Sequence, residues 1–155
     1  MKRFFSLSRV ALLGLVTLAV SGCLGDENTA DQSGKTVTKE DLLHRNFVLT
    51  SIDGKDFVAK HPQPMTPNIE FNEGFRISGA TCNRFMGQAE LNNGVLSVKQ
   101  LAGTMMMCVD PTLNQLETTF AQMLQAGADI SLVDQNLTLR QGGHVLVYKL
   151  KDYVQ

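Results

Sequence analysis

The sequence lacks several features that would indicate particular functions. It contains no tryptophan, and no cluster of lysine and arginine occurs after residue 22. Without a basic cluster, nucleic-acid binding and a charged membrane-binding patch are both disfavoured. No apolar segment after residue 22 is long enough to span a membrane. We find no internal repeat and no low-complexity tract within the domain, so one domain is expected.

Arrangements that carry catalysis or metal binding are also missing. His44, His61 and His144 are far apart, and their spacing fits no metal site. Ser78 and Ser97 lie in no Gly-x-Ser-x-Gly motif. The acidic residues are scattered along the chain. We therefore expect a protein that is not an enzyme and that needs no cofactor or metal.

The N-terminus has the order of a bacterial lipoprotein signal peptide over residues 1–22. Basic residues come first, an apolar run over residues 10–20 follows, and Val20-Ser21-Gly22-Cys23 resembles a lipobox. Cleavage would leave Cys23 as a lipidated N-terminus, and several acyl chains anchor a protein stably to a bilayer. The alternative is an ordinary secretory signal with an unrelated cysteine.

The residues after Cys23 predict where the protein resides and how it is attached. Leu24 stands where an aspartate would retain a lipoprotein at the inner membrane. By resemblance to enterobacterial sorting, this favours the outer membrane, facing the periplasm. Residues 23–37 are small and polar, which predicts a flexible tether of roughly 20 Å ahead of a domain over residues 38–155. Removing 22 of the 155 residues leaves 133, with 11 basic and 15 acidic side chains, a formal charge of −4.

The domain sequence predicts an α+β fold that is mostly antiparallel β-structure. About eight short β-rich runs are separated by turn signals, which favours a meander or a barrel. One of these runs is expected over residues 100–107. One long helix is expected between Asp110 as N-cap and Gly127 as C-cap, with Pro111 at its first position. This helix must be covered by the sheet or close one end of a partly open barrel.

Several apolar residues on the predicted sheet and helix could line a groove that holds a lipid chain or a partner helix. The same residues could equally fill the core. They are Phe71, Phe75, Ile77, Phe120 and Met123.

Three segments of the domain resemble the META domain family. They are Gly79-x-x-Cys82-Asn83-Arg84-Phe85-x-Gly87, then Thr104-x-Met106-x-Cys108, then Glu117 within the helix. The resemblance extends from about Leu42 to Leu150. It implies a cracked antiparallel barrel with a helix, similar to secretion pilotin lipoproteins. It also implies a role in envelope stress and antibiotic tolerance, and it brings no catalytic mechanism.

Cys82 and Cys108 are the two cysteines that remain besides the one expected to be lipidated. In an oxidising periplasm they are expected to form a structural disulfide. Free thiols and a redox-active pair are the alternatives. Redox pairs usually occur as Cys-x-x-Cys, and this spacing is far from that.

Met105, Met106 and Met107 beside Cys108 suggest a soft-metal site, because thioethers suit Cu(I). Three consecutive residues on a strand point alternately to opposite faces, however, so their sulfur atoms do not converge easily. Methionine also fills irregular cores. We therefore prefer packing to metal binding for these residues.

Asn83, Arg84 and Glu117 are the polar residues of most interest. Asn83 is expected to hold a tight turn after Gly79, with Arg84 solvated or paired. The alternative is that Arg84 binds an acidic partner. For Glu117 we expect a cap or a bond from the helix to a strand rather than catalysis. The preferred function is binding of an envelope partner or an apolar ligand, and the alternative is a structural interaction module without a ligand site.

Overall fold

A computed structural model describes residues 36–58 and 66–154 of the chain. The predicted signal peptide, the lipidation site Cys23 and most of the predicted tether lie outside these residues. Within the described ranges, none of the helices has the length and apolarity to cross a membrane.

The described domain begins with a short helix, α1, over Lys39–Leu42. Thr38 caps it: the Thr38 side chain accepts a bond from the Asp41 amide, and the Asp41 carboxylate accepts one from the Thr38 amide at 2.9 Å. This reciprocal arrangement satisfies two donors that the first helical turn leaves free. Val37 is buried in the core. The packed domain therefore includes the last residue of the predicted tether.

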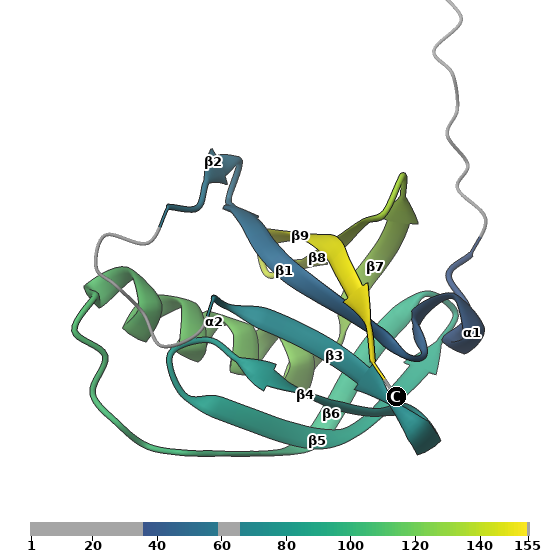
Figure 1. Ribbon diagram of the computed structural model, residues 1–155, viewed down its shortest axis with the longest axis horizontal. Coiled ribbons are helices and arrows are strands. Elements are labelled where there is room, and N and C mark those ends of the chain that lie inside the picture. Colours follow the sequence, from purple (N-terminus) through teal and green to yellow (C-terminus); the bar gives the residue numbers. More distant parts are fainter. Residues whose placement is uncertain (1–35, 59–65, 155) are drawn as a thin grey trace, which may run out of the picture. The chain divides into compact units, whose positions relative to one another are not determined.

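Nine strands and one long helix follow in the order shown in Figure 1. All strand pairs are antiparallel, and β1 pairs with both β3 and β9, so that eight strands close into a barrel while β2 extends β1 at one end. The elements are β1 Arg45–Ile52, β2 Lys55–Asp56, β3 Asn68–Asn72, the 3-10 turn η1 Glu73–Phe75, β4 Arg76–Ala80, β5 Arg84–Asn92, β6 Val95–Gly103, α2 Pro111–Ala126, β7 Ala128–Val133, β8 Asn136–Gln141 and β9 His144–Tyr153. The predicted fold class is confirmed.

The barrel is incomplete between β6 and β7, which pair only at Val95 with Asp129 and at Leu96 with Ala128. Beyond these pairs α2 packs against β6. Figure 1 shows α2 between β1, β8 and β9 on one side and β3 to β6 on the other. The predicted boundaries of α2 are confirmed: Asp110 accepts a bond from the Thr112 amide at 2.9 Å, and Gly127 follows the last turn.

The five residues predicted to line an apolar groove are instead buried in the core. Phe71, Phe75, Ile77, Phe120 and Met123 are each at most 3% exposed. The rings of Phe71 and Phe75 lie 5.7 Å apart, and Phe120 packs against Phe85 at 4.8 Å. Because α2 presses its apolar face directly onto the sheet, the space between helix and sheet is filled. The groove prediction is therefore wrong for these residues, although Phe120 also borders a surface crevice described below.

The predicted strand over residues 100–107 is confirmed only as far as Gly103, where it belongs to β6, and is wrong beyond that residue. β6 begins at Val95 and ends at Gly103, and Thr104 to Val109 form no strand. The Asn83 side chain binds both the N–H and the C=O of Met106. A side chain thus satisfies main-chain groups that a strand would pair with a neighbour.

Gly79 stands where the chain cannot carry a side chain. Its φ is +154°, and an added Cβ would overlap the Asn68 carbonyl oxygen and lie 2.9 Å from a ring atom of Phe85. We expect Gly79→Ala to lower the free energy of unfolding by at least about 2 kcal/mol. Gly142→Ala is the matched control, because its φ is +59° and no atom lies within 4 Å, so only about 1 kcal/mol is expected. Equal losses in urea unfolding would contradict the steric argument.

Asp53, in the turn after β1, should make the stability of the fold depend slightly on pH. Its carboxylate accepts a bond from the Val145 amide at 2.8 Å and contacts His144 Nδ1 at 3.0 Å, and these interactions lower the pKa of Asp53 from its ordinary value. A lowered carboxyl pKa stabilises the fold above the unfolded-state pKa, and this stabilisation is lost as the pH falls through the folded-state value.

The Asp53→Asn variant should therefore be less stable than the wild type at pH 7, by under about 1 kcal/mol because the site is exposed. In urea unfolding the difference should shrink as the pH drops below about 4. Asp129→Asn, on an exposed part of β7, controls for the change in net charge. A difference that stays constant between pH 7 and pH 3 would contradict the assignment.

Candidate functional site

The residues of the family motif gather where the turn between β4 and β5 meets the N-terminal half of α2. Four side chains form a hydrogen-bonded group there, which we call the Asn83–Glu117 cluster: Thr81, Asn83, Thr104 and Glu117. Beside it lies the segment Thr104–Val109, which we call the Met loop. The cluster therefore joins three segments that are far apart in the sequence: the β4–β5 turn, the Met loop and α2.

Glu117 points from α2 into the β4–β5 turn. Its carboxylate accepts bonds from the Asn83 amide at 3.2 Å, from Asn83 Nδ2 at 3.0 Å and from the Thr81 hydroxyl at 3.1 Å. These donors compensate the carboxylate for the water that it loses in this partly buried position. The expected role of Glu117, a bond between helix and sheet, is confirmed, with the β4–β5 turn as the partner.

Asn83 uses its side chain to hold the Met loop. Its Oδ1 accepts bonds from the Met106 amide at 2.8 Å and the Thr104 hydroxyl at 2.9 Å, while Nδ2 donates to the Met106 carbonyl at 2.9 Å. Thr104 Oγ1 in turn accepts a bond from the Arg84 amide at 3.1 Å. Asn83 is buried, so its amide replaces water for main-chain groups of the loop. Asn83 therefore has a structural role, but its side chain holds the Met loop and Glu117 and not the tight turn after Gly79 that was expected.

Cys82 and Cys108 form the predicted disulfide, with their Cα atoms 6.0 Å apart. It connects the β4–β5 turn to the end of the Met loop. The carboxylate of Glu117 lies close enough to both sulfur atoms to complete a metal-binding triad. Each sulfur is bonded to the other, however, and therefore offers no thiolate. As the disulfide stands, these residues do not form a metal site.

The Met loop exposes its apolar side chains. Met105, Met106 and Met107 are largely exposed, and so is Val109. The prediction that the methionines pack is therefore wrong. Their side chains also need not alternate between two faces, as was expected for a strand, because the segment is not a strand. The cause is the set of bonds from Asn83, which hold the main chain away from the sheet.

A surface crevice of about 350 Å³ lies between β6 and α2, directly beside the cluster. Phe85, Leu101 and Phe120 provide apolar lining, and Met105 and Arg84 also border it. Arg84 is exposed, and within the described part of the chain its guanidinium forms no ion pair. The side chains of the Asn83–Glu117 cluster line the crevice as well, so its apolar lining lies beside the exposed cation of Arg84 and the carboxylate of Glu117. We call it the β6–α2 crevice.

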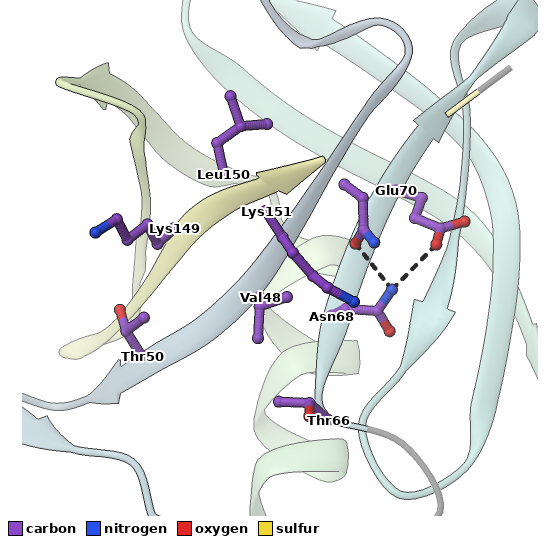
Figure 2. Close-up of a pocket in the computed structure, with 9 residues that line it drawn as sticks. Val48, Thr50, Thr66, Asn68, Glu70, Lys149, Leu150 and Lys151 are labelled. Atoms are coloured by element: carbon purple, nitrogen blue, oxygen red, sulfur yellow. Dashed lines mark hydrogen bonds between the residues drawn. The ribbon is translucent and has the colours of Figure 1, made fainter. Parts of the chain in front are cut away.

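A larger hollow, of about 670 Å³, lies on the outer wall of the barrel over β1, β3 and β9 (Figure 2). Asn68 donates from Nδ2 to Asn46 at 3.0 Å and to Glu70 at 3.2 Å. Lys151 extends over the hollow towards Asn68 (Figure 2). The bond to Asn46 fixes β3 to β1, and the two bonds together occupy the Asn68 amino group. Because none of the motif residues lines this hollow, the β6–α2 crevice remains the stronger candidate.

The structure brings most of the predicted motif residues together. Asn83, Arg84, Thr104, Met106 and Glu117 meet in the cluster through side-chain or main-chain atoms. The remaining motif residues, Gly79, Phe85 and Gly87, pack nearby on β4 and β5.

Sequence reasoning missed two members of this region. Thr81 donates to Glu117, and Asn114 binds both the N–H and the C=O of Cys108. For Asn114, its position one turn after the Asp110-Pro111 helix start is a weak sequence signal of a bond to the preceding loop. For Thr81 we know of no signal.

The fold and this site together define a class: small antiparallel barrels closed by one helix, in which a carboxylate of the helix binds the β4–β5 turn and a disulfide joins that turn to the loop before the helix. The META domain model matches residues 40–153, so the chain belongs to the META domain family. It is 41% identical to the heat shock protein HslJ of Escherichia coli (strain K12) over 147 residues, which cover 94% of this chain and 98% of that protein.

Two structures determined by NMR share the fold. The first is 45% identical, with a TM-score of 0.68, and the alignment covers 75% of this chain and 97% of that one. The second, from Burkholderia xenovorans, is 24% identical, with a TM-score of 0.58, and the alignment covers 73% of this chain and 86% of that one. The second likeness concerns the fold alone.

Proposed function

We propose that this protein is a lipid-anchored, non-enzymatic binding protein of the bacterial envelope that acts in stress and antibiotic tolerance. Its META domain binds an apolar chain in the β6–α2 crevice, either side chains of an envelope partner or the acyl chain of a lipid. Its lipid anchor holds it at the outer membrane, facing the periplasm.

The observation that carries this proposal is the composition of the crevice. Ligand sites are concave and mostly apolar, with few polar groups that orient the ligand. Phe85, Leu101 and Phe120 provide the apolar part, and the guanidinium of Arg84 provides a charge that attracts an acidic group. The carboxylate of Glu117 also lines the crevice, but it already accepts bonds from Asn83 and Thr81. This favours a binding role over a catalytic one for the site.

The cellular part of the proposal has separate support. The order of residues in the signal segment and the lipobox-like Val20-Ser21-Gly22-Cys23 favour lipidation. The disulfide is stable in an oxidising compartment such as the periplasm. The name of the similar protein from Escherichia coli refers to heat shock, which agrees with a role in stress.

Photo-crosslinking from within the crevice tests the binding role. A photoreactive amino acid at Ala121, which lines the crevice, should give adducts in living cells, and mass spectrometry distinguishes protein adducts from lipid adducts. Arg84→Glu should reduce these adducts severalfold, because it reverses the charge beside the crevice. Arg76→Glu, an exposed arginine on β4, is the matched control. Absence of both kinds of adduct would refute the proposal.

The anchor has its own test. Cys23→Ser should abolish labelling by radioactive palmitate and release the protein from the membrane fraction, because no acyl chain is attached. Leu24→Asp should leave labelling intact and move the protein to the inner membrane fraction. A wild-type protein that carries no palmitate would contradict the lipid anchor.

The packed core supports the second candidate, a structural interaction module without a ligand site. Because α2 and the sheet leave no groove at the five residues expected there, a lipid chain cannot enter the interior along them. Protein adducts from a photoreactive amino acid placed on a surface outside the crevice, with none from Ala121, would favour this alternative.

A further inference from the structure

The Met loop exposes three thioethers to an unusual degree. Met105 is 97% exposed, Met106 64% and Met107 92%, whereas Met123 in the core is 1% exposed. Methionine is usually buried in folded proteins. Solutes therefore have direct access to three neighbouring sulfur atoms on this loop.

No bond that fixes the loop involves a thioether. Asn83 binds the main chain of Met106 at 2.8 Å and 2.9 Å. At the end of the loop, Asn114 binds the main chain of Cys108, and the disulfide joins Cys108 to Cys82. A chemical change at the methionine sulfur atoms thus leaves every one of these bonds in place. The loop should keep its conformation when its methionines are modified.

The other sulfur atoms of the described residues are less accessible to oxidants or less reactive than those of the loop. Cys82 and Cys108 are joined in a disulfide and are not thiolates, which are the reactive form of cysteine. Met123 is shielded by the core, and Met86 on β5 is only half exposed. Within the described ranges, the most accessible reducing sulfur atoms therefore lie on the Met loop.

We propose that Met105, Met106 and Met107 form an oxidation site that reacts with two-electron oxidants such as hypochlorous acid. Each thioether gives up an electron pair and gains one oxygen atom as a sulfoxide, while chloride and a proton are released. A dithiol reductant of the methionine sulfoxide reductase class reverses the step, giving the thioether, a disulfide and water. The loop changes from apolar to polar while the barrel stays folded. This inference does not depend on what the β6–α2 crevice binds.

Competition within one molecule provides the test. The full chain is titrated with hypochlorous acid, and sulfoxide is measured at each methionine by peptide mass spectrometry, beside the same protein unfolded in urea. Met105 and Met107 should react within about threefold of their rate in the unfolded chain, and Met123 at least about tenfold slower. The thermal midpoint should stay within about 2 °C after three oxygen atoms have been added. Methionine sulfoxide reductases of both stereospecificities should restore the original mass.

A variant with Met105→Leu, Met106→Leu and Met107→Leu is the control. This variant should take up three fewer oxygen atoms than the wild type. Met86 should be oxidised to the same extent in both proteins. The proposal is overturned if Met123 is oxidised together with the loop, or if the folded loop is protected more than about tenfold. It is also overturned if oxidation of the loop unfolds the domain.

Discussion

Removal of the Cys82–Cys108 disulfide is expected to lower the free energy of unfolding by about 3–4 kcal/mol. The two cysteines are separated by 26 positions, and a crosslink over this distance restricts the unfolded chain far more than the folded one. For a domain whose total stability is about 5–15 kcal/mol, this is a large share. Urea unfolding of the wild type and of a Cys82→Ala/Cys108→Ala variant measures the difference.

Reduction provides a control for this prediction. A dithiol reductant should destabilise the wild type by about as much as the double substitution does, and it should leave the variant unchanged. Alanine is preferable to serine at both positions, since Cys108 is buried and a new hydroxyl there would need a partner. A loss below about 1 kcal/mol would show that crosslinking hardly restricts the unfolded chain.

The elements with local signals were predictable from the sequence. Asp110, Pro111 and Gly127 mark both ends of α2, because a cap, a fixed φ and a C-terminal glycine each act within one helical turn. The hairpin of β3 and β4 follows from apolar alternation, with Phe71 opposite Ile77. Here the residues that determine the structure are neighbours in the sequence or separated by a short turn.

Elements set by distant contacts were not predictable. The end of β6 depends on Asn83, which binds a main chain 23 positions away. β9 continues to Tyr153 because Tyr153 pairs with Arg45 of β1 as the barrel closes. Neither partner can be identified from hydrophobic alternation, which describes one strand at a time.

For the site, the sequence supplied the residues but not their contacts. Compartment and spacing predicted the pair of cysteines, and the family motif named Asn83 and Glu117. The bond between these two residues spans 34 positions and required the fold. Exposure of the Met loop was missed because methionine composition favours a core position, whereas the bonds from Asn83 that hold the loop depend on the fold.

Replacement of Asn83 is the second change with a large expected effect. Asn83→Ala should lower the free energy of unfolding by about 3 kcal/mol, because the Met106 main chain and the Glu117 carboxylate lose partners in a buried position. Asn83→Asp keeps the acceptor that binds Met106 but turns an oxygen towards Glu117, so a loss of about 4 kcal/mol is expected. Asn92→Ala, at the exposed end of β5, should change stability by at most about 0.5 kcal/mol. Urea unfolding measures all three.

Exchanging the side-chain amide of Asn83 with the carboxylate of Glu117 shows how much of the stability loss in Asn83→Asp comes from charge repulsion and how much from altered packing. In Asn83→Asp/Glu117→Gln the amide lies on the helix and the carboxylate on the turn, so one donor again faces one acceptor. The double variant should recover about half of the loss caused by Asn83→Asp, since the Met106 carbonyl still lacks its donor. No recovery would mean that the cluster stabilises the fold through packing and not through its hydrogen bonds.

The same measurements distinguish how the cluster and the disulfide stabilise the domain. If the disulfide acts on the unfolded chain and Asn83 on the folded loop, their losses should add to within about 0.5 kcal/mol. Combining Asn83→Ala with Cys82→Ala/Cys108→Ala tests this directly. A combined loss larger than the sum by more than about 1 kcal/mol would mean that either one alone can hold the Met loop in place. The disulfide would then act on the folded state as well, by holding the loop against the β4–β5 turn.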